Sequence, residues 1–277
     1  MIGNVFGEVE IFKGLKAKTS YAMNRLNVEN KSFRNPVHGD GANANGAAEN
    51  INSRYNRTDW TTTLNYITTV AKNHNVNVLA GYEEIFTELD TWGALRTNLT
   101  DPYFTTYQGG YTTITPSTSN LEGINGFRSY FSNLFYDFKK RYLLSASFRR
   151  DGFSGLAQGR QFGNFAGGSI GWNISEEGFF AKSKLAETIS DLKIRASYGK
   201  VGNVGVSDFA SLSLYSAGLY GATPTLGYSQ AGNTLLGWET SKKTDIGINV
   251  ALWQNKVIIE ADYYNNNIDG LDYRSHY

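Results

Sequence analysis

Length, composition and charge narrow the class of protein before any motif is considered. The chain has 277 residues, a net charge of +1, 14% aromatic and 18% charged residues, and no cysteine. A charge this small argues against a nucleic-acid-binding face, and the lack of cysteine excludes disulfides, thiolate zinc sites and thiol nucleophiles. Few charges and many Tyr and Phe residues suit a β-protein whose surface is not all in water.

Alternation of apolar and polar residues dominates the chain and predicts long β-strands. In chain order we place ten strands, near residues 2–11, 15–27, 58–71, 76–90, 126–138, 142–150, 165–174, 191–200, 237–253 and 257–267. In the ninth strand, for example, Ile246 and Ile248 lie on one face and Asp245 on the other. Each strand therefore has an apolar and a polar face, and most reach the roughly 9–11 residues of a tilted membrane strand.

The connections between these strands alternate in length. Short ones, such as 139–141, alternate with long polar ones near 28–57, 91–125, 151–164 and 201–236. The segment 38–50 is rich in Gly, Asn and Ala and is predicted to be flexible, and the link 175–190 is predicted to hold a short helix. Tight turns at one end and long loops at the other are typical of an all-β, antiparallel, up-and-down transmembrane β-barrel. A soluble β-sandwich that binds carbohydrate or mediates adhesion is the alternative.

One motif could indicate an enzyme. The sequence "GGSIG" at 167–171 matches the nucleophile elbow and would make Ser169 a nucleophile. That elbow needs a strand, a sharp turn, a helix and a later histidine. Here the alternation continues through Ile174, and the only later histidine is His276. We therefore expect Ser169 inside a strand and no catalytic residues.

The remaining polar motifs predict no metal site and no cofactor. Glu83 and Glu84 are neighbours on a strand, so they point to opposite faces instead of forming a glycosidase pair. The pair at 176–177 is interpreted in the same way, as solvated or lumen-facing acids. His38 and Asp40 fit no Ca²⁺ loop, and the glycines at 199–205 do not match the dinucleotide fingerprint.

Aromatic residues near the strand ends have two interpretations. The residues concerned are Tyr142, Trp172, Trp253, Tyr263 and Tyr264. Amphipathic rings at such positions anchor a barrel at the membrane–water interface. Ordinary cross-strand packing is the other possibility.

Four stretches of the chain resemble the barrel of SusC/RagA-type TonB-dependent outer-membrane transporters. They are "SYFSNLFYDFKKRYLLSASFRRDGFSG", "GNFAGGSIGWNISEEGFF", "DLKIRASYGKVGN" and "LLGWETSKKTDIGINVALWQNKVIIEADYYNNNIDGL". The similarity is dense from about 120 to 271 and thinner before that. Ala166 and Gly167 replace the family's Pro-Ser, and Gly178 stands where the family usually has Pro.

The resemblance implies a part of a large, plugged barrel in the bacterial outer membrane. We expect residues 1–277 to be barrel only, without the plug domain and the closing strands. Such transporters import glycan or peptide oligomers with a SusD-like surface lipoprotein and the TonB complex, without catalysis or nucleic acid. Outer-membrane lipid would then contact the apolar faces. The polar residues expected to face the lumen are Lys193, Arg195, Asp245, Asn249, Glu260 and Asp262.

The long loops carry the residues we expect to contact an oligosaccharide or oligopeptide ligand. Aromatic rings in the loops 91–125 and 201–236 could stack on sugar rings. These residues are Tyr103, Phe104, Tyr107, Tyr111, Tyr215 and Tyr220.

Overall fold

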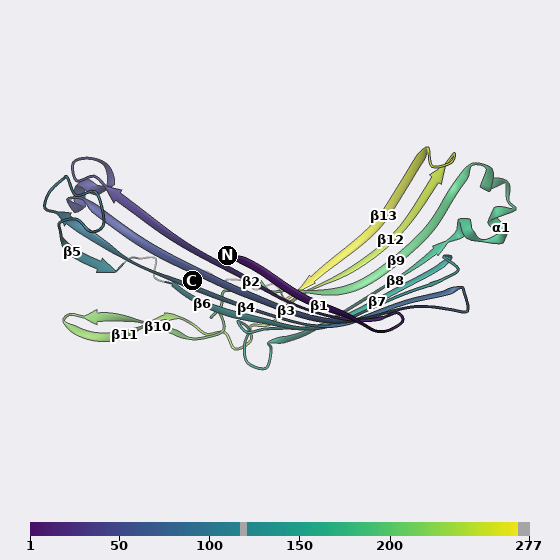
Figure 1. Ribbon diagram of the computed structural model, residues 1–277, viewed down its shortest axis with the longest axis horizontal. Coiled ribbons are helices and arrows are strands. Elements are labelled where there is room, and N and C mark those ends of the chain that lie inside the picture. The colour runs from purple at the N-terminus through teal and green to yellow at the C-terminus, as the bar shows by residue number, and fades with distance from the viewer. Residues whose placement is uncertain (117–120, 271–277) are drawn as a thin grey trace. The chain divides into compact units, whose positions relative to one another are not determined.

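The computed structural model describes residues 1–116 and 121–270 as an almost entirely antiparallel β-structure (Figure 1). The ten predicted strands are all present, and three further strands lie in the long connections. The strands are β1 (Ile2–Phe12), β2 (Leu15–Arg34), β3 (Ala47–Val70), β4 (His74–Leu99), β5 (Tyr111–Pro116), β6 (Leu121–Phe138), β7 (Tyr142–Phe153), β8 (Phe162–Asn173), β9 (Ile189–Asn203), β10 (Leu214–Tyr220), β11 (Thr223–Gln230), β12 (Glu239–Leu252) and β13 (Val257–Asp269).

The helices are short. They comprise the 3-10 helices η1 (Gly39–Ala44), η2 (Ile174–Glu176) and η3 (Lys184–Glu187), and the α-helix α1 (Gly178–Ala181). Three of them lie in the link at 175–190, which confirms the helix predicted there. Among residues 1–116 and 121–270, no helix combines the length and the apolar character that a membrane crossing requires.

Eleven of the strands form one sheet with neighbours in chain order. The order is β1-β2-β3-β4-β6-β7-β8-β9-β12-β13, with β5 paired to β4, and β10 and β11 form a separate hairpin. This is the up-and-down order predicted from the sequence. A sandwich needs two sheets packed face to face, so the single large sheet argues against that alternative.

By its internal contacts the chain divides into two compact units. The first consists of Met1–Val5, Tyr21–Asp59 and Ile85–Gly126, and the second of Phe6–Ser20, Trp60–Glu84 and Phe127–Tyr277. The second unit contains the short turns and most of the residues that resemble the transporter family.

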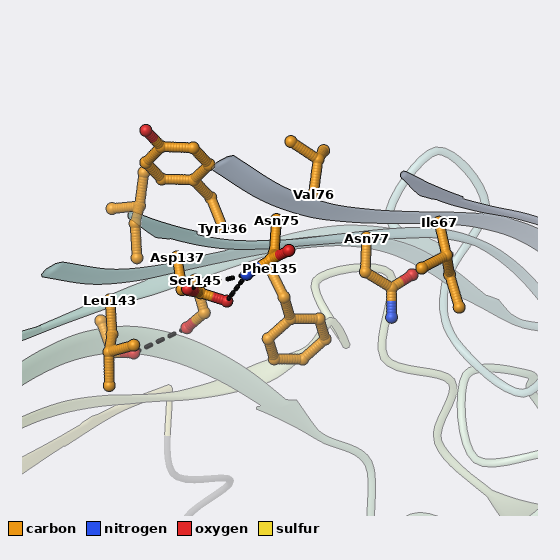
Figure 2. Close-up of a pocket in the computed structure, with 11 residues that line it drawn as sticks. Ile67, Asn75, Val76, Asn77, Phe135, Tyr136, Asp137, Leu143 and Ser145 are labelled. Carbon is orange, nitrogen blue, oxygen red and sulfur yellow. Dashed lines mark hydrogen bonds between the residues drawn. The ribbon is translucent and has the colours of Figure 1, made fainter. Parts of the chain in front are cut away.

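Strand pairing in the second unit gives the sheet two chemically different faces. The apolar face has the row Tyr136, Leu144, Ile170, Ala196, Ile246 and Tyr263, one residue from each strand. The polar face has the adjacent row Phe135, Ser145, Ser169, Ser197, Asp245 and Tyr264. Figure 2 shows this alternation on β4 and β6, where Val76 and Tyr136 point to one side and Asn77 and Phe135 to the other.

The described residues of the second unit leave the apolar face uncovered. Ile170 is 61% exposed and Ile246 is 51% exposed. The buried core lies instead among the loops, where Phe153, Leu156 and Leu236 form a cluster. A large exposed apolar surface is unfavourable in water, so this face requires an apolar surrounding.

The long connections differ from the prediction in extent and order. The strands β2, β3 and β4 continue far into the loops expected at 28–57 and 91–125, because backbone pairing persists where polar and apolar residues are mixed on both faces and the alternation disappears. The segment 38–50, predicted to be flexible, contains η1, and Ala47 and Ala48 are buried. Asn45 Nδ2 also donates to Asn98 Oδ1 at 2.9 Å, so this segment is packed and hydrogen-bonded.

Candidate functional site

A cluster of charged side chains on the polar face is centred on Arg195 of β9. Its Nη2 donates to Asp262 Oδ1 of β13 at 2.6 Å, and its Nη1 donates to Asp245 Oδ1 of β12 at 3.1 Å. Its Nε donates to Asn249 Oδ1 at 3.1 Å, and Asn249 Nδ2 donates to Glu260 Oε1 at 2.6 Å. Five of the six residues predicted to face the lumen are therefore joined in one network, the Arg195 cluster.

The reach of Arg195 across the sheet depends on Gly247. Gly247 pairs with Arg195 on one side and with Asp262 on the other. A Cβ atom at Gly247 would lie 2.1 Å from Asp262 Oδ1 and 2.8 Å from Arg195 Cζ. Arg195 therefore crosses β12 at the one paired position that has no side chain. Lys193, the sixth predicted residue, lies on the same face opposite Asn249.

A second cluster on the polar face is centred on Arg149 of β7. Its Nη2 donates to Glu83 Oε2 at 2.9 Å and to Ser129 Oγ at 3.0 Å, and its Nε donates to Asp151 Oδ1 at 2.6 Å. The guanidinium carbon also lies 5.5 Å from the centre of the Phe131 ring. The sequence placed Arg149 at a strand end without partners, because Glu83 is 66 residues away along the chain.

Near the short turns, the polar face holds neutral and carboxylate groups bonded to one another. Asn75 Nδ2 donates to Asp137 Oδ1 at 3.1 Å and Oδ2 at 3.0 Å, and the hydroxyls of Ser145 and Ser169 are 2.6 Å apart (Figure 2). Ser169 lies inside β8, which continues to Asn173, so the strand–turn–helix of a nucleophile elbow is not formed there. His276 is outside the described residues.

The two pairs of neighbouring glutamates, at 83–84 and 176–177, have different surroundings. Glu83 binds Arg149 on the polar face, whereas Glu84 accepts from Tyr82 and Arg128 on the apolar face, as the alternation predicts. Glu177, predicted to be solvated or lumen-facing, is instead buried.

Glu177 joins the link after β8 to the ends of the neighbouring strands. It accepts from Tyr142 Oη at 2.6 Å, from Trp172 Nε1 at 3.2 Å and from Arg141 Nη1 at 3.2 Å. The hydrogen bond from Tyr142 and the additional bond from Trp172, with the charge of Arg141, lower the pKa of Glu177 below its ordinary value. The sequence prediction was wrong because two of these donors, Tyr142 and Arg141, are more than thirty residues earlier in the chain.

Aromatic rings form a row on the apolar face beside the short turns. Phe138, Tyr142 and Trp172 are stacked in succession, with ring centres 6.3 and 6.5 Å apart. A second row contains Trp60, Tyr82 and Tyr130, with centres 5.7 and 5.2 Å apart.

The two rows are separated by a distance close to the height of an apolar membrane band. Tyr130 and Phe138 are eight residues apart on β6, roughly 27 Å along the strand, which is about 21 Å in height for a strand tilted by about 40°. Outer-membrane barrels have an apolar band about 25 Å tall between aromatic girdles. Of the residues predicted for a girdle, Tyr142 and Trp172 are in the first row, whereas Tyr264 is on the polar face opposite Asp245.

The far edge of the apolar face is a line of polar side chains that crosses the strands obliquely. We define this polar boundary by the first charged or amide side chain on the apolar face of each strand, counted from the short turns. Its members, from β6 to β13, are Arg128, Arg150, Asn164, Lys200, Lys242 and Asn265. The boundary does not follow one row of paired residues. It comes closer to the short turns from β6 to β13.

The slope of the polar boundary equals the tilt of strands in a barrel. Phe138 on β6 and Ala261 on β13 belong to one paired row, which serves as the reference level. Counted from this row along each strand, Arg128 is ten residues away on β6 and Asn265 is four residues away on β13. The difference of six residues is about 20 Å, and five strand spacings are about 24 Å, so the boundary is inclined by about 40° to the line perpendicular to the strands. Strands of outer-membrane barrels tilt by about 35–45°, and the boundary then lies at one depth.

The predicted ligand-contact residues fall in two separate groups. Tyr103 is 91% exposed, whereas Tyr111 Oη donates to the backbone oxygen of Phe104 at 3.4 Å, and the Tyr107 ring lies 4.8 Å from the guanidinium of Arg96.

The other group is on the β10–β11 hairpin. There Tyr215 is edge-to-face with Tyr228 at 5.4 Å and Tyr220 is 85% exposed. Among the residues with described positions, no group of three or more His, Cys, Asp or Glu could hold a metal ion.

Comparison with known proteins identifies the fold and the family. The family described as TonB dependent receptor-like, beta-barrel matches residues 9–274. TonB-dependent receptor P39 of Formosa agariphila is 32% identical over 271 residues, which are 96% of this chain and 25% of that protein. TonB-dependent receptor SusC of Bacteroides thetaiotaomicron is 33% identical over 152 residues, which are 52% of this chain and 15% of that protein.

Solved structures agree with this result at the level of the fold. The RagAB peptide transporter superimposes with a TM-score of 0.85 over 97% of this chain and 30% of that chain, at 22% identity. The chain spans about a quarter of the length of the curated relatives that it matches along most of its sequence. The resemblance to SusC/RagA-type transporters and the incomplete barrel are thereby confirmed. The chain belongs to the TonB-dependent receptor-like β-barrel family of the bacterial outer membrane.

Proposed function

We propose that this chain is part of the wall of a transporter that imports glycan or peptide oligomers across the outer membrane. In this proposal the apolar face contacts lipid and the polar face lines the lumen. The Arg195 and Arg149 clusters then face the ligand or the plug that occupies the lumen. The function is binding and passage, without bond-making chemistry, in keeping with relatives that are receptors.

The oblique polar boundary is the observation that carries this proposal. The boundary is inclined by about 40° to the line perpendicular to the strands. When the strands themselves tilt by about 40°, all residues of the boundary lie at one depth in the membrane, as a barrel wall requires. A soluble sheet has no reason to change polarity along such a line, because its strand ends are all in water.

The partners follow from the family and from the span of the chain. We assign residues 1–277 to the barrel, and the plug domain and closing strands to the part of the relatives that this chain does not cover. Similarity to SusC and to the RagAB transporter supports a SusD-like surface lipoprotein as partner and the TonB complex as energy source. The exposed loop tyrosines, Tyr103 and Tyr220 above all, are proposed ligand contacts.

Uptake by cells that carry the complete receptor tests the proposal. Deletion of the receptor should abolish uptake of a labelled oligosaccharide or a labelled oligopeptide, and deletion of TonB should have the same effect. The class that is lost identifies the cargo. Unchanged uptake of both classes, or recovery of the receptor as a monodisperse protein without detergent, would contradict the proposal.

A further inference from the structure

Four basic side chains lie along the polar boundary on the apolar face: Arg128, Arg150, Lys200 and Lys242. Two of them have acidic partners. Arg128 Nη2 lies 3.3 Å from Glu84 Oε1, and Lys242 Nζ lies 2.6 Å from Asp269 Oδ2. Four positive groups against two negative ones leave this edge of the sheet with a surplus of two positive charges.

Arg150 and Lys200 account for this surplus, and the carboxylate of Asp269, which Lys242 binds, also acts electrostatically on Lys200. Within the described part of the chain, neither has a carboxylate oxygen at ion-pair distance, and the Arg150 guanidinium lies 5.1 Å from the ring centre of Phe162. The strand between them, β8, contributes Asn164 and Ala166 at this level, and both are exposed. The two cations therefore flank an uncharged strip of the sheet.

The strand register places these two cations within reach of one anion. Arg150 pairs with Asn164, and the β8–β9 pairing, continued from Gly167 and Gly199, puts Lys200 beside Ala166. Their backbones are thus two strand spacings apart, about 10 Å, with an offset of about 7 Å along the strands. Both side chains are long and flexible, and Asn164 lies between them as a further donor.

We propose that Arg150, Lys200 and Asn164 bind the phosphate group of a lipid in the outer leaflet. A folded barrel has only lipid beside its apolar face, so an anion at this depth belongs to a lipid headgroup. Arginine binds phosphate with two parallel hydrogen bonds, and lysine extends its ammonium from an apolar surface to the interface. The site lies at the level where the apolar band ends, which is where a headgroup is expected.

The surface below the cations suits the acyl chain of the same lipid. Gly168 of β8 pairs with Ala146 and with Tyr198. Phe148 and Tyr198 are exposed on the two neighbouring strands. Phe148 pairs with Ala166, and Tyr198 pairs with Gly168 one row nearer the short turns, so the small residues of β8 lie beside an aromatic ring in both rows and leave room for an acyl chain below the proposed phosphate site.

Native mass spectrometry of the complete receptor in detergent, titrated with lipid A, tests the proposal. Lipid A carries phosphate groups, and its dephosphorylated form and inorganic phosphate serve as the two comparison probes. Removing one basic group near a membrane surface weakens binding about fivefold. Arg150→Gln and Lys200→Gln should each have this effect on lipid A, and the double variant should weaken binding about thirtyfold.

The matched control is Lys193→Gln, since Lys193 is on the same strand as Lys200 but on the polar face. It should bind lipid A as the unmodified receptor does. Heat-modifiable migration on an unboiled gel shows that each variant is folded. Equal binding of dephosphorylated lipid, equal loss in the Lys193 variant, or inorganic phosphate that binds as tightly as lipid A would overturn the proposal.

Discussion

Replacing Gly247 with alanine tests whether the Arg195 cluster requires a gap on β12. The new methyl group would lie 2.1 Å from Asp262 Oδ1 and 2.9 Å from Arg195 Nε, both closer than van der Waals contact allows. The atoms it meets are the ends of flexible side chains, so the strand itself need not move. The expected result is that Arg195 swings away and loses Asp262, while β12 stays paired.

The size of the effect follows from the exposure of the groups. The side chains of Arg195 and Asp262 are 35% and 37% exposed, so each lost contact is worth roughly 0.2–1 kcal/mol, as for surface ion pairs. Loss of the bond to Asp262 and weakening of the bond to Asn249 then cost about 0.5–2 kcal/mol. Alanine in a strand is favoured over glycine by roughly 0.5–1 kcal/mol, which offsets part of this cost.

Gly199→Ala is the comparison variant, because it has the same intrinsic gain of alanine over glycine in a strand and this gain then cancels in the difference. Gly199 lies on the polar face of the neighbouring strand β9, where a Cβ atom would meet only Gly167 Cα at 3.7 Å. Gly199→Ala should therefore stabilise the receptor, and Gly247→Ala should be less stable than it by about 0.5–2 kcal/mol. Urea unfolding in lipid vesicles measures the difference, and hydrogen exchange of peptides from β12 and β13 localises it.

A receptor that lacks the guanidinium group of Arg195 shows whether Arg195 causes the difference in stability between the two alanine variants. In the Arg195→Leu receptor the two alanine substitutions should have the same effect, because no charged group crosses β12. If Gly247→Ala matches Gly199→Ala in the unmodified receptor as well, the route of Arg195 over Gly247 is refuted.

Three further predictions concern the faces, the turn and the loops. Leu134→Arg, in the middle of the apolar band, should destabilise the receptor in vesicles by about 2–4 kcal/mol, whereas Asn133→Arg on the polar face should cost less than 1 kcal/mol; equal costs would contradict the assignment of the faces. The lowered pKa of Glu177 means that its contribution to stability is complete above the ordinary glutamate pKa of about 4.3 and disappears as the pH falls through the lowered value. Trp172 fluorescence should follow this transition, which Glu177→Gln should remove. Tyr103→Ala or Tyr220→Ala should weaken ligand binding by about 2- to 12-fold, the worth of one aromatic contact, whereas Tyr198→Ala on the apolar face should leave it unchanged.

The strands and their faces were predictable because a period of two residues is a local signal. Once Asp245 and Ile246 are assigned to opposite faces, every residue of β12 is assigned with them. The members of the Arg195 cluster could be predicted in part, because the sequence assigns them to the same face. Whether they contact one another also depends on the register of the neighbouring strands. The outer parts of β3 and β4 were missed because polar and apolar residues are mixed on both faces there, and pairing is then visible only in the backbone.

Contacts between distant strands could not be predicted, and they determine the chemistry of both the polar face and the turn. Glu177 is buried only because Tyr142 and Arg141, more than thirty residues earlier, end at the same level of the sheet. Gly247 is one glycine among 30, and the sequence of β12 alone does not show why a glycine is needed there. Its importance comes from the register that sets Arg195 on one side and Asp262 on the other. A side chain at this position would separate the two charges, so the contact between Arg195 and Asp262 requires a glycine at position 247.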